Sequence, residues 1–409
     1  MPRVYDVILF VLLAFAYILA PVAALIFALI FYKRSVSQFY IVAFAFYFGY
    51  QVGPVLDLQN HYENYRTFFN HPLSMMFTDE LTLFYGKEPF HVLFKYVLAY
   101  FHASDRVFAG TTCALYTTLF ILFVRQLKPI YAKRMTAMQV CTFLLMVVSV
   151  EFYWYLGLRF WTGVFFMMMI YTKYLMTKNK LLLLLLPLGM LFHYVLISAA
   201  IVLILSTILV HRRVLVMTLA AISYVVKYVE FGFLNYLSNF SYINAGFRDK
   251  LQTEATLRAL KEQTDYFRNE GNFIYQHRTD FIFFAVVLVI IFVYRKNKEI
   301  VKNCFPSLFA AVCLALVVAN IGYSEYVFYT RFYKFVALLA SLYLFLLVSD
   351  PRCRNYFGIL TELIILTIAV FCLLIAFVQL RNSLLNIELW LGNFFTEVPI
   401  ATYLQGKKF

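Results

Sequence analysis

The chain has 409 residues, of which 63% are hydrophobic and 14% are charged, and its formal net charge is +14. Soluble domains contain about half apolar and a quarter charged residues, so this composition excludes an ordinary soluble domain and predicts an all-α, polytopic integral membrane protein. The positive charge gathers in short loops between apolar segments, as it does on the cytoplasmic side of membranes. No nucleic-acid partner is needed to explain it.

Apolar segments long enough to cross a bilayer recur along the chain. The first, residues 7–32, is too long for the apolar core of a signal peptide, so we expect a retained helix. The charged loops place both termini outside, and twelve crossings fit that topology. The expected spans cover residues 7–32, 38–54, 107–124, 136–151, 159–176, 181–192, 194–210, 214–229, 279–294, 303–321, 332–349 and 357–379.

The first outer loop, residues 54–103, is long and aromatic, and Glu88–Phe101 within it is predicted to form a short helix at the membrane interface. Asp57 shares a possible helical face with His61 and Tyr65. It is a candidate general base, and a solvated loop acid is the alternative. The candidate substrate-binding residues of this loop are Tyr62, Tyr65, Arg66 and Glu88.

Arg159 opens the span 159–176 at its outer end, between Trp154 and Trp161. The planar guanidinium matches the geometry of phosphate groups, so Arg159 is a candidate cation for a diphosphate. The alternative is an arginine that snorkels to the membrane interface.

Residues 181–210 lie between two basic loops, KNK and HRR. A single helix of this length would be about 45 Å long and would place the two loops on opposite sides of the membrane. We therefore expect a hairpin of two short helices that turns at Phe192-His193-Tyr194, below the outer surface. Non-helical backbone at that depth is tolerated beside a polar cavity. His193 is thus a candidate general base, with Tyr194 as a sugar contact, and a core histidine bonded to a carbonyl is the alternative.

Two further clusters lie near the outer face. The outer loop 230–278 contains a predicted amphipathic helix, Thr253–Gln263, and Lys227 and Arg278 at its edges are candidate phosphate contacts or membrane anchors. Arg331 follows a tyrosine-rich segment and is a second candidate cation, with an aromatic belt and its anchors as the alternative. The substrate-binding candidates around it are Tyr323, Glu325, Tyr329 and Lys334.

The sequence contains no P-loop, no HExxH, no GxGxxG after a strand and no DxD pair, so we expect chemistry without a metal or a cofactor. The cysteines lie within spans or beside cytoplasmic loops and none lies in an expected outer loop, so we expect no disulfide framework. They also show no CxxC spacing of the kind that binds metals. No repeat or linker divides the chain, and residues 1–409 are expected to form one transmembrane domain.

The order of these motifs resembles the EpsG-type branch of Wzy-like polysaccharide polymerases. The resemblance covers about residues 40–345. It departs at Phe160, where the family usually has Gln, and at Val195, where Ser is common. The motifs that carry it are Asp57 with HYENY, Glu88-Pro89-Phe90, Gly157-Leu158-Arg159, Phe192-His193-Tyr194 and a late Arg331 cluster.

The resemblance implies a GT-C-like fold in the bacterial cytoplasmic membrane, with the active site facing outward. It also implies that undecaprenyl-diphosphate-linked oligosaccharide is both donor and acceptor, with a chain-length regulator as a possible partner. Arg159 and Arg331 would stabilise the leaving diphosphate, and His193 or Asp57 would accept the proton of the acceptor hydroxyl. The alternatives are a flippase or transporter of the same lipid, an O-antigen ligase and a membrane O-acyltransferase.

Overall fold

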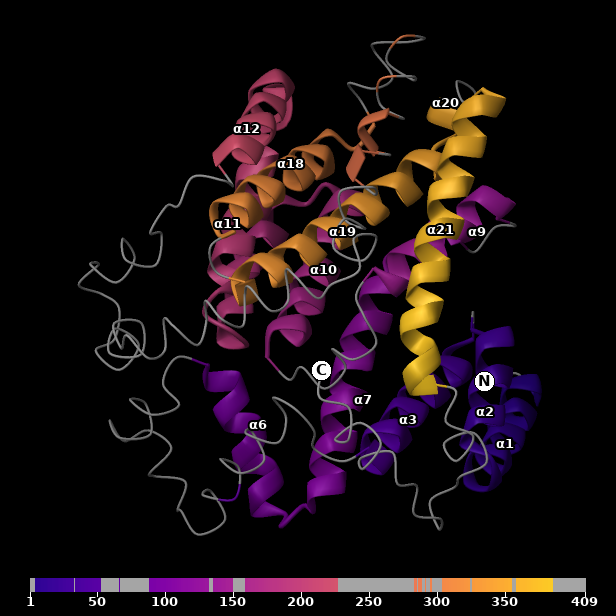
Figure 1. Cartoon of the computed structure of the whole chain (residues 1–409). Coiled ribbons are helices and arrows are strands. Elements are labelled where there is room, and N and C mark those ends of the chain that lie inside the picture. Colours follow the sequence, from indigo (N-terminus) through magenta and orange to yellow (C-terminus); the bar gives the residue numbers. More distant parts are fainter. Residues whose placement is uncertain are drawn as a thin grey trace. The chain divides into compact units, whose positions relative to one another are not determined.

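The computed structural model describes residues 4–32, 34–52, 66, 88–131, 135–149, 159–226, 304–323, 326–354 and 358–384, together with isolated positions between 283 and 295. Every regular element in this part of the chain is a helix (Figure 1), which confirms the all-α class. By length and composition, Asp105–Arg125 and Phe328–Ser349 can cross a membrane, and several shorter apolar helices accompany them. The count of twelve crossings stays a prediction.

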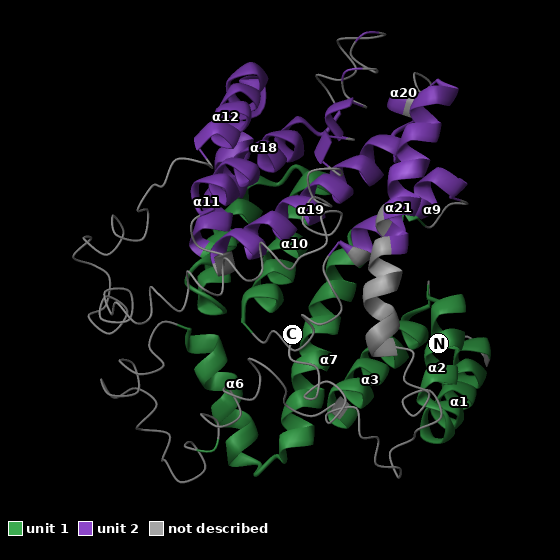
Figure 2. Cartoon of the chain, viewed as in Figure 1, with its two compact units in different colours: residues 1–133, 152–196, 377–409 green, residues 134–151, 197–376 purple. Residues whose placement is uncertain are grey.

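The chain divides into two compact units, which Figure 2 distinguishes by colour. Unit 1 comprises residues 1–133, 152–196 and 377–409. Its helices are α1 (Val4–Leu19), α2 (Pro21–Ile30), α3 (Ser35–Val52), α6 (Pro89–Tyr100), α7 (Asp105–Arg125), α8 (Lys128–Tyr131), α10 (Phe160–Thr177) and the 3-10 helix η4 (Lys180–Leu191).

Unit 2 comprises residues 134–151 and 197–376. Helix α19 is mostly buried and forms the centre of the unit together with α18. The helices that begin in it or at its edge are α9 (Ala137–Val148), α11 (Leu196–Ile208), η5 (Leu209–His211), α12 (Arg213–Val226), α18 (Pro306–Ile321), α19 (Tyr326–Ser349), α20 (Pro351–Arg354) and α21 (Ile359–Leu384).

The first predicted span is two helices rather than one. Helix α1 ends at Leu19, and α2 begins at Pro21, which occupies its first turn. Proline lacks a backbone N–H and its ring clashes with the preceding turn, so it starts a helix well and interrupts one in the middle. The prediction of a single helix over residues 7–32 is wrong for this reason.

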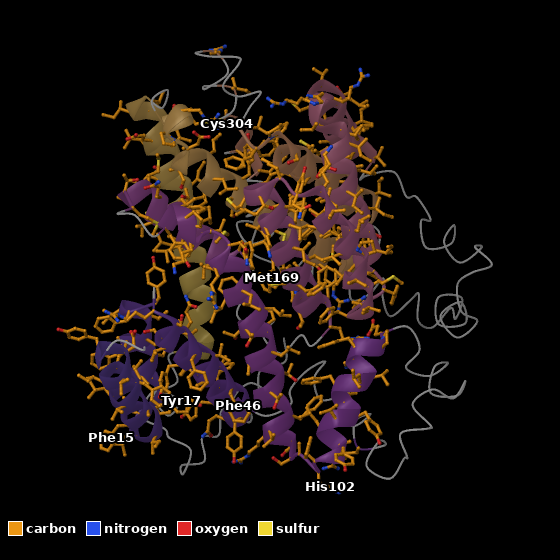
Figure 3. All side chains as sticks on the ribbon, turned by 180° about the vertical axis from the view of Figure 1, so that it is seen from behind. Phe15, Tyr17, Phe46, His102, Met169 and Cys304 are labelled. Atoms are coloured by element: carbon orange, nitrogen blue, oxygen red, sulfur yellow. A yellow bond between two sulfur atoms is a disulfide. The ribbon has the colours of Figure 1, made fainter. Side chains whose placement is uncertain are left out.

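The surface of unit 1 is apolar and part of its interior is polar. On α1, Phe15 is 67% exposed, whereas Ser37, Gln51 and Thr112 on α3 and α7 are buried. Tyr17, which Figure 3 labels with Phe15 on the same helix, donates from its hydroxyl to the carbonyl oxygen of Ala43 at 2.6 Å. Soluble proteins have the opposite arrangement, so these outer faces suit lipid hydrocarbon. The structure therefore supports association with a membrane.

Helices α3 and α7 pack closely because two glycines stand at their interface. A Cβ atom at Gly110 would lie 2.8 Å from the carbonyl oxygen of Phe46, and one at Gly49 would lie 2.5 Å from that of Ala109. Small residues allow membrane helices to approach in this way. Helix α7 also packs on α10, where the rings of Tyr116 and Phe165 are 5.1 Å apart. These contacts fix α10 within unit 1.

The chain breaks at Phe192–Val195, where the sequence analysis places a turn. The segment before the turn is the 3-10 helix η4, about 24 Å long at the rise of such helices. Pro187 lies inside it and cannot donate a helical hydrogen bond, which disfavours a continuous α-helix. The break confirms the two-segment interpretation, while the hairpin geometry of the segments stays a prediction.

In unit 2, Cys304 and Cys353 form a disulfide, with their Cα atoms 7.4 Å apart. The expectation that no disulfide forms is wrong. It relied on the placement of every cysteine within a span or beside a cytoplasmic loop, and the two residues that pair are 49 positions apart in the sequence. Packing of α18 against α19 brings the segment before α18 next to the segment after α19.

Candidate functional site

Three segments of unit 1 meet at the carboxylate of Glu88. Arg159 Nη1 donates to Glu88 Oε2 at 3.2 Å, and His193 Nδ1 lies 3.6 Å from Glu88 Oε1. Glu88 precedes α6, Arg159 precedes α10, and His193 lies in the turn between η4 and α11. The structure thus brings together three predicted site residues from distant parts of the sequence.

Glu88 is the N-cap residue of α6, and Pro89 occupies the first turn. Aspartate, asparagine, serine and threonine are the residues whose side chains ordinarily accept a hydrogen bond from the backbone at an N-cap. The Glu88 side chain makes no such bond, and its carboxylate contacts Arg159 instead. Its side chain is only 6% exposed. A buried carboxylate needs a compensating cation or hydrogen bonds, so its direction toward Arg159 is energetically important.

Arg159 is the N-cap residue of α10 and is the more accessible member of the ion pair, with 29% of its side chain exposed. Its carbonyl oxygen accepts the N–H of Gly163 at 3.2 Å, which joins it to the first turn of α10. A guanidinium has five N–H donors in a fixed plane. The contact to Glu88 through Nη1 is therefore compatible with a second, anionic partner.

His193 is buried, and two neighbours compete for its Nδ1 atom. The backbone N–H of Val195 donates to Nδ1 at 3.2 Å, whereas Glu88 Oε1 lies 3.6 Å away. The first distance lies within the range of hydrogen bonds and the second does not. Nδ1 therefore acts as the acceptor of the Val195 N–H, and Glu88 Oε1 is a close neighbour of the imidazole.

Aromatic packing fixes the turn that carries His193. The ring of Phe192 lies 4.1 Å from that of Phe90 on α6 and 5.3 Å from that of Phe166 on α10, measured between centroids. Gly163 leaves room for this ring, because a Cβ atom there would lie 2.8 Å from Phe192 Cβ. The ring of Phe160 meets the imidazole of His193 edge to face at 5.9 Å. The turn is therefore held by α6 and α10 together.

The site extends along α6 to His91 and Lys95, which were not among the residues predicted from the sequence. Both are buried, at positions i+3 and i+7 from Glu88, while Leu93 and Val97 on the other face are exposed. Residues three, four and seven apart share one side of a helix. The spacing Glu-x-x-His-x-x-x-Lys could have revealed a helix with its charged face inward, an arrangement expected where a membrane helix borders a polar interior.

The Arg331 cluster belongs to unit 2. The ring centroids of Tyr323 and Tyr329 are 4.9 Å apart, and those of Tyr329 and Tyr333 are 4.8 Å apart. Arg331 and Lys334 are half-buried in the first turns of α19. The expected gathering of Arg331 with Arg159 and His193 stays a prediction, because those residues belong to unit 1.

Tyr194 lies beside His193, with ring centroids 5.0 Å apart, and is partly exposed. Arg66 is an isolated described position and is exposed. The remaining candidates lie outside the described residues, as do the amphipathic helix and the rest of the loop 230–278. These candidates are Asp57, Tyr62, Tyr65, Lys227, Arg278 and Glu325.

Comparisons of the chain with protein-family models, with curated proteins and with solved structures return no match.

Proposed function

We propose that this protein is a multi-pass membrane glycosyltransferase that extends a glycan carried on a polyprenyl diphosphate, without a metal or a cofactor. The observation that carries the proposal is the meeting of Glu88, Arg159 and His193 in unit 1. The buried carboxylate can act as a base, the partly exposed guanidinium can bind an anion, and the imidazole can bind a hydroxyl group. The proposal includes twelve crossings, a GT-C-like fold and an outward-facing site in a bacterial cytoplasmic membrane.

Arg159 is the proposed ligand of the diphosphate. When the bond between the sugar C1 and the diphosphate oxygen breaks, negative charge develops on that oxygen, and a guanidinium stabilises such charge through paired N–H groups. Removal of a comparable charge-stabilising donor typically costs about 100- to 1,000-fold in rate. The exposed fraction of Arg159, larger than those of Glu88 and His193, suits a residue that must reach a substrate.

Glu88 is the proposed base. As the acceptor oxygen forms its bond to C1, the proton of that hydroxyl moves to a carboxylate oxygen of Glu88. His193 then has a positioning role, because its Nδ1 accepts from the backbone of Val195 and lies 3.6 Å from Glu88 Oε1. This assignment modifies the sequence-based hypothesis, in which His193 or Asp57 accepted the proton.

The inward face of α6 is proposed to border the sugar-binding region. His91 and Lys95 place an imidazole and an ammonium group on the same side of the helix as Glu88. The opposite face exposes Leu93, Val97 and Tyr100, which suit contact with lipid. A substrate with a lipid tail and a polar head needs both surfaces close together.

The proposal is tested with the full-length chain purified in detergent and supplied with a lipid-diphosphate-linked oligosaccharide. We expect longer lipid-linked glycans without nucleotide sugar or added divalent metal, resolved by gel electrophoresis and mass spectrometry. Arg159→Ala should lower the rate about 100-fold or more. Lys173→Ala is the matched control, because Lys173 is an exposed cation on the same α10 helix, away from the site.

Other outcomes point to other functions. Movement of the lipid across vesicles without elongation identifies a flippase, and product formed only with an acyl donor identifies an acyltransferase. Transfer of the glycan only to a lipid A-type acceptor identifies a ligase. Equal rates in Arg159→Ala and Lys173→Ala remove Arg159 from the site.

A further inference from the structure

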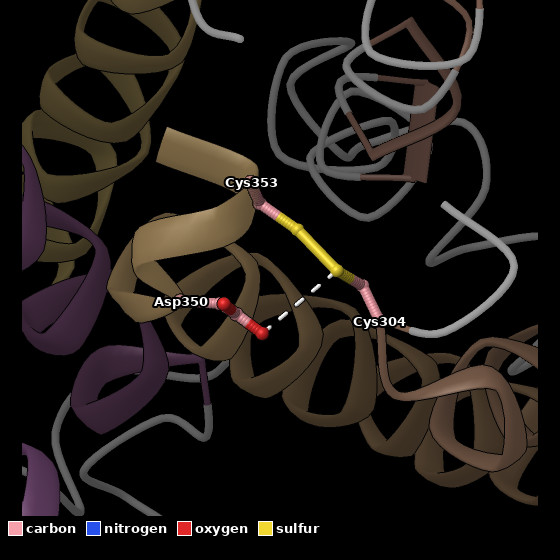
Figure 4. A group of neighbouring side chains, drawn as sticks. All are labelled: Cys304, Asp350 and Cys353. Carbon is pink, nitrogen blue, oxygen red and sulfur yellow. Dashed lines mark hydrogen bonds between the residues drawn. A yellow bond between two sulfur atoms is a disulfide. The ribbon is translucent and has the colours of Figure 1, made fainter. Parts of the chain in front are cut away.

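One corner of unit 2 gathers two cysteines and an aspartate (Figure 4). Cys304, Asp350 and Cys353 each offer one ligand atom, and these atoms lie within 4.8 Å of one another. Both cysteines are buried, and the side chain of Asp350 is 8% exposed. Cys304 Sγ lies 3.9 Å from Asp350 Oδ2, the contact drawn as a dashed line in the figure.

Local backbone structure holds the three residues in place. Phe305 has a positive φ of 44°, which turns the chain between Cys304 and the start of α18 at Pro306. Asp350 directly follows α19 and caps α20, where its Oδ1 accepts the N–H of Arg352 at 2.9 Å. The N–H of Cys353 donates to the carbonyl oxygen of Asp350 at 3.0 Å. The two ligands from this segment therefore stand three residues apart on one helical turn.

The charge around this corner indicates a reducing compartment. Basic residues precede Cys304 and flank Cys353, and such loops lie on the cytoplasmic side of membrane proteins. Thiols on that side are kept reduced. The disulfide of this structure then has a reduced counterpart, in which two buried thiols face one carboxylate. The basic residues are Lys296, Lys298, Lys302, Arg352 and Arg354.

We propose that reduced Cys304 and Cys353, together with Asp350, bind one zinc ion. Zinc accepts both thiolate and carboxylate ligands, at about 2.3 Å and about 2.0–2.2 Å. Two sulfurs on one tetrahedral zinc lie about 3.8 Å apart, against about 2.0 Å in a disulfide, so zinc tolerates a wide separation of Cα atoms. The observed separation of 7.4 Å suits that arrangement.

The oxidised protein would acquire zinc in two steps, reduction of the disulfide and binding of the ion. Two molecules of a small thiol reductant convert the disulfide to two thiols and leave as their own disulfide. Zinc binding then displaces one proton from each thiol, so two protons are released for each ion bound. A water molecule completes the four-coordinate shell. The side chain of Arg352 is 64% exposed, so it can move from Asp350 into solvent when a carboxylate oxygen of Asp350 coordinates the metal.

The test uses the full-length chain in detergent, reduced with a phosphine and freed of reductant and metal. Titration with zinc against a chromogenic chelator should give one tight site, and titration with cobalt(II) should give a thiolate charge-transfer band. The same protein oxidised to the disulfide should bind neither ion tightly. This comparison uses one folded sequence, so it does not depend on the stability of any variant.

The variants assign the ligands. Cys304→Ser/Cys353→Ser should lose the site and the cobalt band. Asp350→Asn should lower zinc affinity by about tenfold or more, since even loss of an indirect partner of a metal costs about 10- to 100-fold. Cys141→Ser, at a free cysteine on α9, is the control and should bind as the wild type does.

Absence of a tight site in the reduced wild type, or equal binding by its oxidised form, overturns the proposal. Neither result bears on glycan transfer, because the zinc titration uses no lipid-linked substrate.

Discussion

Among the arginine–carboxylate pairs of the described residues, Arg352–Asp350 of unit 2 is a local contact, whereas Arg159–Glu88 of unit 1 joins distant segments. In unit 2, Arg352 and Asp350 are two residues apart, and Arg352 contacts both carboxylate oxygens, at 2.7 and 3.1 Å. In unit 1, Arg159 and Glu88 are 71 residues apart and share one contact of 3.2 Å. Asp350 also caps the helix that follows it, whereas the Glu88 side chain does not.

The local fold accounts for the pair in unit 2 but not for the pair in unit 1. Asp350 would adopt its position to cap α20 whether or not it also binds a metal ion, and Arg352 is largely in solvent. Glu88 does not cap its helix, and it is buried against a cation at the start of another helix, at a cost in desolvation. Such a cost is common at functional sites of membrane proteins. The comparison therefore separates a pair that ordinary folding explains from one that calls for a function.

The largest expected effect comes from replacing the unit 1 pair by apolar residues of similar size. Arg159→Met alone leaves Glu88 buried without its cation and should destabilise the protein by about 3 kcal/mol. Glu88→Leu/Arg159→Met should recover most of that loss, because a buried pair exchanged for apolar side chains is often neutral. Activity should remain about 100- to 1,000-fold low in both variants. Thermal unfolding in detergent and the elongation assay measure the two quantities.

The equivalent exchange in unit 2, Asp350→Leu/Arg352→Met, is the control for glycan transfer. It should leave elongation unchanged, since neither residue takes part in the proposed mechanism of glycan transfer. Recovery of both stability and elongation in the Glu88→Leu/Arg159→Met protein would show that the unit 1 pair is structural.

The next effect concerns the room that Gly163 leaves for the turn of His193. In Gly163→Leu the new side chain meets Phe192 and Leu196. Overpacking of this kind costs about 1–3 kcal/mol. A displacement of His193 by about 1 Å should lower the elongation rate about 100-fold. The rate at saturating substrate and the unfolding temperature are the measurements.

Met169→Leu is the control for this variant, because it conserves volume on the same helix, where Figure 3 labels the residue. It should cost less than about 1.5 kcal/mol and leave elongation unchanged. If Gly163→Leu loses stability but keeps full activity, the position of His193 is not critical to transfer.

A smaller effect is expected at Lys95, which tests how far the polar face of α6 takes part. Lys95→Met keeps the length of the buried side chain and removes its charge. Loss of a hydrogen bond from a charged group to substrate should lower the elongation rate about tenfold. Val97→Met, on the exposed face of α6, is the control. A strong loss of stability with unchanged elongation would assign Lys95 to a structural contact.

The sequence was sufficient for the helical class and for several local features, because these depend on nearby residues. The break at Phe192–Val195 follows from the length of the segment and the basic loops on either side of it. The short helix that begins at Pro89 follows from the preference of proline for the first turn of a helix. The interruption at Pro21 follows the same rules and could have been predicted. It was missed because residues 7–32 form one continuous apolar segment, which was interpreted as a single helix. The number of crossings depends on a membrane and on segments beyond the described residues.

The site could be predicted only in part, because a single sequence does not show which distant segments are in contact. Arg159 and His193 were identified from their depth in apolar segments, but Glu88 was ranked below them. Nothing local reveals that its carboxylate turns away from its own helix. The proximity of Cys304 and Cys353 was unpredictable for the same reason, since packing of α18 and α19 creates it.

The smallest expected effect is the pH dependence of the unit 2 pair. Burial raises the pKa of the Asp350 carboxyl, but hydrogen bonds from Arg352 and its positive charge outweigh burial, so the pKa lies below the ordinary value of 3.8. A carboxyl with a lowered pKa in the folded state stabilises the protein above its unfolded pKa, and this contribution is lost as the pH falls through the folded value. Because Arg352 is largely exposed, the contribution should be below about 1 kcal/mol.

Arg352→Ala measures that contribution directly. Its unfolding temperature should lie slightly below that of the wild type at pH 7. The difference should shrink as the pH falls below 3.8 and through the lower pKa of folded Asp350, where protonation weakens the pair in the wild type as well. High salt should shrink the difference too, because solvent-exposed charges are screened. A difference as large as that of Arg159→Met at pH 7 would mean that the two pairs are energetically alike. The distinction drawn from their geometry would then not hold.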